Sequence, residues 1–245
     1  MKLWGITHRG AVRQQNQDAY AVRELEDGRG LAVVCDGMGG ARAGNVASSM
    51  AVELFMRKLE EQGQPGDDPQ KWLKTAAAHA NDGVFQKAVE DPDCTGMGTT
   101  LVAALAGNGK AVLLNEGDSR AYHITQDGIT RITRDHSLVE SMVERGDITE
   151  EEARRHPNRN LITRALGTDE TVESDGYRTA LAAGEYLLLC TDGLTITVTD
   201  QEMLFEILHG GDEESCLSRL LAIAKEHGAP DNVTAVLMRQ PEGCE

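Results

Sequence analysis

Short apolar segments separated by turn-forming residues run along most of the chain. Most span about four to eight residues, are rich in valine, leucine, isoleucine or threonine, and are bounded by glycine, aspartate or asparagine, as is typical of β-strands. Asn-Gly at 108–109 and Asp-Gly at 127–128 lie between such segments and predict hairpin turns. The pattern predicts strands over Lys2–Thr7, Ala19–Arg23, Leu31–Asp36, Thr99–Ala106, Ala111–Asn115, Arg120–Thr125, Ile129–Thr133, Tyr177–Ala182, Tyr186–Cys190 and Val233–Arg239.

Four other stretches carry apolar residues at helical spacing. The first, Gly44–Gln62, places Val46, Met50, Leu54 and Leu59 at helical intervals and ends before a glycine and a proline. Because the helices interrupt the strands in pairs and not singly, this order favours an α+β domain layered on antiparallel sheets. The other predicted helices are Asp68–Val89, Asp200–Leu208 and Glu213–His227. The first of these has a short polar break at residues 81–83.

One charged stretch, Ser137–Leu166, has few positions that could contribute to a core. We interpret it as a helical excursion from the sheet that forms a surface flap. A solvated helical insertion without a role in function agrees equally well with its composition.

Carboxylates stand at the ends of the most apolar segments. Asp36 closes one such run, Asp192 follows another by two positions, and Asp231 comes just before a third. An ionised carboxylate at the edge of a core must be paired, hydrogen-bonded or bound to a cation. No lysine or arginine lies within these runs, so a bound cation is the predicted partner. Oxygen ligands without clustered histidine or cysteine favour Mg²⁺ or Mn²⁺ over zinc.

Glycines and two polar clusters extend this candidate site. Gly37 lets the backbone come close enough for its carbonyl to join the coordination. The glycine-rich segment 36–40 could cradle a phosphate before a helix, but it lacks the Gly-Lys-Ser/Thr of a nucleotide-binding loop. The cluster that ends at Asp18 holds Arg13, a residue type suited to bidentate phosphate recognition, and taken alone it is equally well a polar loop. Asp118 again follows an apolar strand.

Charge and composition restrict which partners the protein can bind and in which cellular compartment we expect it. With 24 basic and 40 acidic residues, the net charge of −16 disfavours nucleic acid and anionic membranes as partners. Neither a secretory signal nor an apolar run of about 20 residues is present. The five cysteines are scattered and lack C-x-x-C spacing, so they support neither zinc binding nor a disulfide framework. We expect a reduced, cytoplasmic protein that is a monomer.

Taken in order, the motifs resemble those of the metal-dependent type 2C protein Ser/Thr phosphatases, specifically their compact bacterial branch. No single motif is decisive, but the ordered set is highly specific and covers about residues 1–240. The matching segments are Val12-Arg13 with Asn16–Asp18, Val34–Gly40, Thr95–Thr100, Asn115–Tyr122, Asp135–Val139, Ile162–Gly167, Thr191–Leu194 and Asp231–Thr234.

The resemblance implies a fold and a reaction. The fold is a central β-sandwich of two antiparallel sheets flanked by pairs of helices, with a metal cleft at one end. One catalytic domain would span residues 1–240, with a flap at about 137–166 and a tail at 241–245. The reaction is hydrolysis of phosphoserine and phosphothreonine in proteins, by in-line attack of a water or hydroxide that bridges two Mn²⁺ or Mg²⁺ ions. Such an enzyme would oppose a bacterial Ser/Thr kinase.

The same resemblance assigns metal ligands. Asp36 would bridge both ions, and the Gly37 carbonyl would bind one of them. Asp192 and Asp231 would bind the other, and Asp18 would support the site directly or through water.

Arg13 would clamp the substrate phosphate. Asp118, together with Asp192, would form a weaker third metal site.

This sequence departs from the family pattern at two positions. Gln17 stands where many members carry glutamate, so metal ligation there is an open question. Met38 stands where the eukaryotic branch has a histidine that is proposed as general acid, and methionine cannot donate a proton. His136 and His156, in or beside the flap, are the alternative candidates for the acid, and metal-bound water without any such group is the other possibility.

Two competing functions remain compatible with the sequence. A non-catalytic relative could keep the fold as a binding module, although this would require loss of the metal aspartates, which are all present. A hydrolase of small phosphoesters would use the same cleft chemistry as a protein phosphatase.

Overall fold

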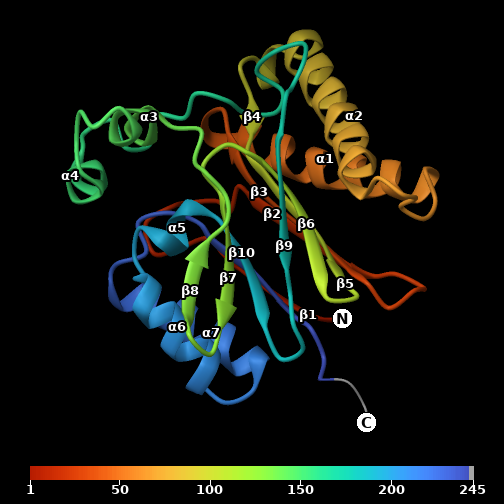
Figure 1. Cartoon of the computed structure of the whole chain (residues 1–245). Coiled ribbons are helices and arrows are strands. Elements are labelled where there is room, and N and C mark those ends of the chain that lie inside the picture. Colours follow the sequence, from red (N-terminus) through yellow and green to blue (C-terminus); the bar gives the residue numbers. More distant parts are fainter. Residues whose placement is uncertain (243–245) are drawn as a thin grey trace.

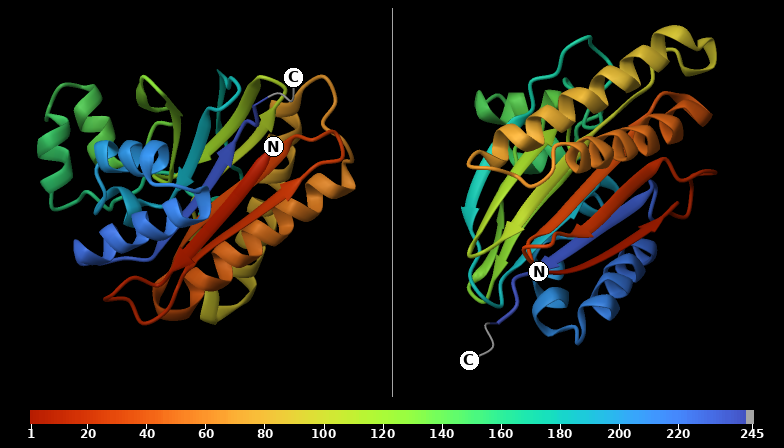
Figure 2. Two further views of the ribbon diagram at one scale, coloured as in Figure 1. Left: turned by 90° about the horizontal axis from the view of Figure 1, so that it is seen from below. Right: turned by 90° about the vertical axis from the view of Figure 1, so that its right-hand side faces the viewer.

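The computed structural model describes residues 1–242, except for the side chains of residues 41 and 42. Cys244 and the rest of the predicted tail beyond residue 242 lie outside the described residues. Two antiparallel sheets pack face to face, and helices cover both outer faces (Figure 1). In Figure 2 the right-hand view shows these four layers in succession. The predicted fold class, a β-sandwich between pairs of helices, is confirmed.

The first sheet joins the two ends of the chain. Its strands lie in the order β1-β11-β10-β7-β8, and every neighbouring pair is antiparallel. Lys2 lies opposite Arg239 and His8 opposite Val233, so the first and last strands are paired along their whole length. The strands are β1 (Lys2–His8), β7 (Arg120–Thr125), β8 (Gly128–Arg131), β10 (Tyr186–Cys190) and β11 (Val233–Arg239).

The second sheet has the order β2-β3-β5-β6-β9, and the two-residue strand β4 pairs with the end of β3. Its register places Asp18 directly opposite Asp36, which brings two of the predicted site residues together. The strands are β2 (Asp18–Glu24), β3 (Gly30–Met38), β4 (Gly98–Thr99), β5 (Leu101–Gly107), β6 (Lys110–Glu116) and β9 (Asp175–Ala180).

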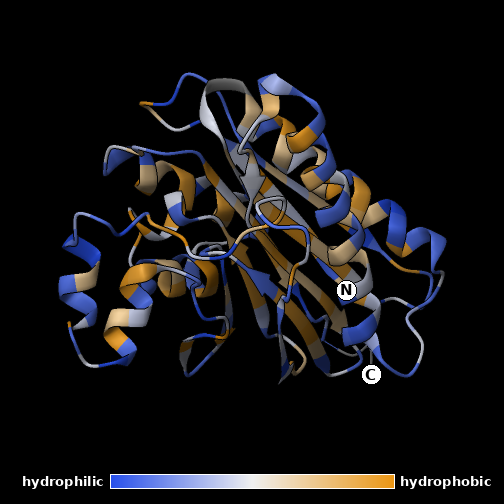
Figure 3. Cartoon of the chain, turned by 90° about the horizontal axis from the view of Figure 1, so that it is seen from above, coloured by the Kyte–Doolittle hydropathy of each residue, from blue (hydrophilic) through white to orange (hydrophobic). Residues whose placement is uncertain are grey.

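Three apolar clusters hold the layers together. The alternation of side chains along each strand sends Ala32 and Val34 between the sheets and Leu31 and Val33 toward the helices. Helices α1 (Gly40–Glu61) and α2 (Pro69–Glu90) cover the second sheet. Helices α6 (Asp200–His209) and α7 (Glu213–Glu226) cover the first. Figure 3 shows the resulting pattern, with apolar strands inside and polar helix faces outside.

The remaining helical segments of residues 1–242 are short. Within the predicted flap, α3 (Leu138–Glu144) and α4 (Glu150–Arg155) project to one side of the sandwich, at the upper left of Figure 1. Helix α5 (Asp192–Thr195) follows β10. A short 3₁₀ turn spans Pro92–Cys94. None of the helices within residues 1–242 combines the length and apolar character that crossing a bilayer would require.

The predicted strand boundaries shift in two places that bear on the site. β3 does not end at Asp36 but continues to Met38, because Gly37 and Met38 pair with β4. The predicted strand over 99–106 is divided into β4 and β5 at Thr100, whose backbone N–H donates to the Asp36 carbonyl. The first difference places Asp36 inside β3, and the second places Thr100 against its main chain.

The predicted break in α2 at residues 81–83 is wrong, because the helix runs through it without interruption. The Asn81 side chain is buried, accepts from the Gly167 N–H at 2.8 Å and donates to the carbonyls of residues 169–170. At Gly83 an added Cβ would lie 2.2 Å from Leu54 Cδ1, so the missing side chain lets α1 and α2 approach closely. These residues read as a helix break only because their tertiary partners lie far away in the sequence.

We expect Asn81→Ala to lower the free energy of unfolding by about 2 kcal/mol, because the buried Gly167 N–H loses its acceptor. Urea denaturation followed by circular dichroism measures this change. The neighbouring exposed residue provides the control, since Asp82→Ala should cost less than about 0.5 kcal/mol. Equal stability of the two variants would contradict a role for Asn81 in holding the 165–170 loop.

Candidate active site

A cleft of about 450 Å³ opens at one end of the sandwich. The strand ends explain its position, because β1 and β10 finish where β11 begins, and Asp36 lies near the end of β3. Its lining includes six of the predicted residues, namely Arg13, Asp36, Gly37, Asp118, Asp192 and Asp231. The predicted residues Asp18, His136 and His156 are not part of the lining.

The backbone of Asp36 is held from the neighbouring strand. Its N–H donates to Thr100 Oγ1 at 2.9 Å, and its carbonyl accepts from Thr99 Oγ1 at 2.8 Å. Thr100 Oγ1 in turn contacts the buried Ser119 hydroxyl at 2.7 Å. The Asp36 carboxylate is therefore carried on a segment whose main chain has fixed partners on both sides.

Asp18 is buried behind the cleft lining. One carboxylate oxygen accepts hydrogen bonds from Thr234 Oγ1 at 2.7 Å and from Thr191 Oγ1 at 2.9 Å. The other oxygen, Oδ1, is buried and has no hydrogen-bond partner. Burial raises the pKa of Asp18 to about 7, and the charges of Asp192 and Asp231 add to the rise while the two hydroxyls oppose it.

Asp231 has a basic partner, contrary to our expectation that the strand-end carboxylates lack one. Arg13 Nη2 lies 2.6 Å from Asp231 Oδ2, and the arginine side chain is about half exposed. The apolar runs do not reveal this pair, because Arg13 lies in the loop after β1, 218 positions before Asp231. The hydrogen bond to Asp231 also raises the pKa of Arg13.

Burial, together with neighbouring carboxylates, raises the pKa values of the remaining cleft aspartates. Burial raises the pKa of Asp192 to about 6, and the Asp231 charge adds to this. Burial also raises the pKa of Asp36, as do the charges of Asp18, Asp192 and Asp118. Asp118 is affected in the same direction by burial and by Asp192. A bound cation reverses this cost of ionisation, because it favours the charged form of every carboxylate around it.

The donor set fits a hard divalent cation, although the side chains are not arranged as a finished coordination shell. The cleft offers carboxylate and main-chain oxygens, and the buried Asp192 Oδ1 has no hydrogen-bond partner. Within residues 1–242 no group of three or more His, Cys, Asp or Glu side chains is already placed to hold an ion. Asp231 is turned to Arg13 and Asp18 to two threonines, which accounts for part of this difference.

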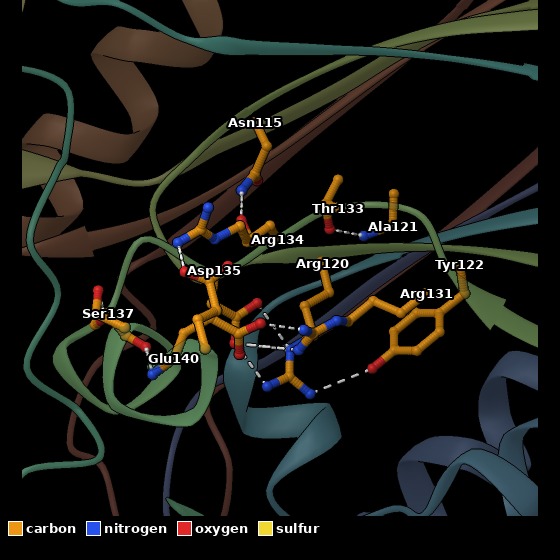
Figure 4. Close-up of polar contacts among 12 residues, drawn as sticks. Asn115, Arg120, Ala121, Tyr122, Arg131, Thr133, Arg134, Asp135, Ser137 and Glu140 are labelled. Atoms are coloured by element: carbon orange, nitrogen blue, oxygen red, sulfur yellow. Dashed lines mark hydrogen bonds and ion pairs between the residues drawn. The ribbon is translucent and has the colours of Figure 1, made fainter. Parts of the chain in front are cut away.

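On the side of Asp118 the cleft is bordered by a network of ion pairs (Figure 4). Arg120 Nη2 lies 2.6 Å from Asp135 Oδ2 and the Arg120 Nε contacts both oxygens of that carboxylate. Arg131 joins Asp135 to Glu140 of α3, so the network connects β7 and β8 with the first flap helix. The Arg120 charge lowers the pKa of Asp118, and that of Asp135 raises it.

A second cavity of about 370 Å³ adjoins the cleft on this side. It shares Asp118, Asn160 and Asp192 with the cleft and extends between the flap helices and residues 195–200. Asp118 therefore lies at the junction of the two cavities.

The two histidines proposed as general acids have other surroundings. His136 is buried, its Nδ1 accepts from the Gly117 N–H at 3.1 Å, and its Nε2 lies 3.2 Å from Asp175 and contacts Arg164. Burial lowers the pKa of His136, so the ring favours the neutral form. His156 follows α4, and its Nδ1 accepts from the Asn158 N–H at 3.1 Å. Neither ring borders the cleft, so the geometry gives no support to an acid role.

Our prediction missed residues that organise the site without being charged. Asn232 accepts from the Gln17 N–H and donates to the carbonyls of Arg9 and Gln15, which fastens the N-terminal loop to the cleft. Thr191 and Thr234, which hold Asp18, and Thr100, which holds Asp36, were quoted as parts of motifs but given no role. The available signal was their position in the sequence: Thr191 directly precedes Asp192, Thr234 follows Asp231 by three positions, and Thr100 directly follows Thr99.

Comparisons with known proteins agree with this geometry. A family model described as protein phosphatase 2C matches residues 6–237. The serine/threonine phosphatase stp of Listeria innocua is 38% identical over 237 residues, covering 96% of this chain and 94% of that protein. The crystal structure of serine/threonine phosphatase Stp1 from Staphylococcus aureus superposes with a TM-score of 0.93 at 37% identity, over 99% and 95% of the two chains. The PstP catalytic domain in complex with two manganese ions gives a TM-score of 0.86 at 34% identity, over 98% of each chain.

The helix-covered sandwich and its carboxylate cleft define a metal-dependent phosphoprotein hydrolase. The chain belongs to the protein phosphatase 2C family and is a serine/threonine phosphatase of the bacterial type. The family predicted from the ordered motifs is thus confirmed.

Breaking the Arg120–Asp135 pair should destabilise the protein strongly. We expect Asp135→Asn to lower the free energy of unfolding by about 3 kcal/mol, because a largely buried guanidinium then lacks its counter-charge. Asp147→Asn, which removes the exposed ion pair with Arg145, should cost less than about 1 kcal/mol. Chemical denaturation of both variants compares the two losses, and similar small values would contradict the structural weight given to the network.

Proposed function

We propose that this phosphatase removes phosphate from phosphoserine and phosphothreonine in proteins with two Mn²⁺ or Mg²⁺ ions bound in the cleft. The observation that carries the proposal is the convergence of Asp36, Asp118, Asp192 and Asp231 on one cavity, where burial and neighbouring carboxylates raise the pKa values of Asp36, Asp118 and Asp192. The PstP catalytic domain, of known structure with two manganese ions, supports the choice of metal.

The proposed ligand roles are those that the resemblance to the family implies. Asp36 would serve both ions. The Gly37 carbonyl would serve one ion, and Asp192 with Asp231 the other. Asp18 would act indirectly, because its hydroxyl-bonded carboxylate lies behind the lining. Asp118 with Asp192 would hold a weaker third ion.

When bound, such ions supply an activated water for in-line attack on phosphorus and offset charge on the phosphoryl oxygens. The protein positions the groups that surround the phosphate and the ions. Threonines 99 and 100 fix the Asp36 main chain, and Asn232 fixes the loop that carries Arg13. Arg13 would exchange the Asp231 carboxylate for the substrate phosphate, where a guanidinium can donate two parallel hydrogen bonds. This exchange would also free Asp231 for metal binding.

The proposed substrate is a phosphorylated protein and not a small phosphoester. The names of the relatives, among them Protein phosphatase PhpP of Streptococcus pneumoniae, point to phosphoproteins and not to small phosphoesters. A cleft at the surface with a second cavity beside it offers room for a protein segment around the phosphorylated residue. The enzyme would then reverse the action of a bacterial Ser/Thr kinase.

Metal removal and ligand substitution test the proposal together. We expect EDTA to abolish turnover of a phosphothreonine peptide and Mn²⁺ to restore it. Asp36→Asn and Asp192→Asn should each lower kcat/KM by more than about 100-fold, beyond the usual cost of losing a partner outside the ligand shell. Asp127→Asn, in an exposed turn, is the matched control. Activity that survives chelation, or full activity of both variants, would refute the metal mechanism; faster turnover of small phosphoesters than of phosphopeptides would refute the substrate class.

Arg13→Ala should lower kcat/KM for the same peptide by about 100-fold, because the phosphoryl oxygens lose a positioned cation. Steady-state kinetics at saturating Mn²⁺ measures the effect. Arg9→Ala removes another exposed arginine of the same loop and should leave kcat/KM nearly unchanged. If the two variants behave alike, Arg13 does not clamp the phosphate.

A further inference from the structure

Gln17 borders the cleft where the family pattern has glutamate, and its side chain is turned to the protein main chain. Its Nε2 donates to the carbonyl of Gly40, the first residue of α1, at 2.6 Å. Gly40 ends the glycine-rich segment that begins at Gly37, and Asp36 directly precedes that segment. The amide thus bonds to the far end of the loop that carries two of the proposed ligands.

The main chain of Gln17 is itself held at three points. Its N–H donates to Asn232 Oδ1 at 2.8 Å, and its carbonyl accepts from the Gly37 N–H at 3.0 Å and from Ser48 Oγ at 2.5 Å. The side chain therefore extends from a fixed base. Together the side-chain and main-chain bonds connect both ends of the 37–40 segment to one residue.

Gly44 leaves the space that the Gln17 side chain occupies, and Gly37 lets the end of β3 approach the main chain of Gly44 and of Gln17. A Cβ added at Gly44 would lie 2.8 Å from Gln17 Nε2, and one added at Gly37 would lie 2.0 Å from the Gly44 carbonyl oxygen. The start of α1, the end of β3 and the Gln17 amide therefore pack against one another without room for additional atoms. Such packing leaves the amide little room to move.

We propose that Gln17 is a positioning residue whose side-chain amide holds the glycine-rich segment 37–40 in place over the carboxylates before any ion binds. The amide can donate this hydrogen bond, whereas the ionised glutamate of the family pattern cannot. A carboxylate of the same size would place a negative oxygen 2.6 Å from the Gly40 carbonyl oxygen with no proton between them, so it would be repelled. The role goes beyond the proposed function and rests on it only where Asp36 and Gly37 are taken as metal ligands.

Two consequences distinguish this role from that of an acidic residue at position 17. The cleft carries one negative charge fewer than it would with glutamate, so each cation is attracted less strongly. In compensation, the segment that presents the Gly37 carbonyl is already ordered, which lowers the conformational cost of binding the ion.

Hydrogen–deuterium exchange of the metal-free protein at pH 7.5 in EDTA tests the contact directly. Gln17→Glu and Gln17→Met both remove the donor, so we expect exchange over residues 37–48 to rise about five- to tenfold, as loss of one hydrogen bond implies. Gln14→Glu makes the same amide-to-acid change in an exposed residue of the same cleft and should leave exchange in this segment unchanged. Wild-type exchange in both Gln17 variants would overturn the proposal.

Calorimetric titration with Mn²⁺ separates positioning from simple support of the fold. Gln17→Met should weaken Mn²⁺ binding about tenfold without a matching change in the cooperative unfolding transition. Gln17→Glu should bind Mn²⁺ more tightly than Gln17→Met, because it restores a charge although not the hydrogen bond. Unchanged Mn²⁺ affinity in Gln17→Met would refute the positioning role, even if Asp36→Asn remained inactive and the proposed function stood.

Discussion

The repulsion among partly buried carboxylates at one end of the sandwich is the constraint on which the rest of this structure depends. Burial raises the pKa of Asp36, and the charges of Asp18, Asp192, Asp118 and Asp231 raise it further. Two hydrophobic sheets must nevertheless bring these groups together, because the strands that carry them belong to the core. The fold therefore stores an unfavourable electrostatic arrangement that a divalent cation relieves, and metal dependence follows from the packing of the strands.

Neutral and basic neighbours make this arrangement tolerable. Threonine hydroxyls satisfy one oxygen of Asp18, Arg13 faces Asp231, and the Arg120 charge acts on Asp118. The threonines and Arg13 come from strands or loops distant in sequence from the carboxylates that they serve, whereas Arg120 lies two positions after Asp118. The second sheet thus supplies Asp36, while the strands of the first sheet and the loops that follow them supply the groups that contact Asp18 and Asp231.

The sequence predicted the layers and the central carboxylates well, for physical reasons that can be named. Continuous apolar runs had to be buried strands, and charges at their ends had to meet at an edge of the core, so Asp36, Asp192 and Asp231 could be found without a structure. Long-range pairs could not. The Arg13–Asp231 contact and the bonds of Asn81 join segments separated by 218 and 86–89 positions, which no local pattern records. His136 was a candidate acid because the sequence around it is charged, and that pattern does not reveal that the side chain is buried.

The pairing of β1 with β11 determines when, during synthesis of the chain, the cleft can assemble. Asp18 near the beginning of the chain is held by Thr234, which lies in the strand that is made last. During synthesis the ribosome adds residues in order, so Asp231 and Asn232 of the cleft lining, and the Thr234 hydroxyl that contacts Asp18, are absent until β11 is made. The cleft is therefore assembled only after translation has passed through β11, and a polypeptide that stops before residue 231 lacks part of its wall.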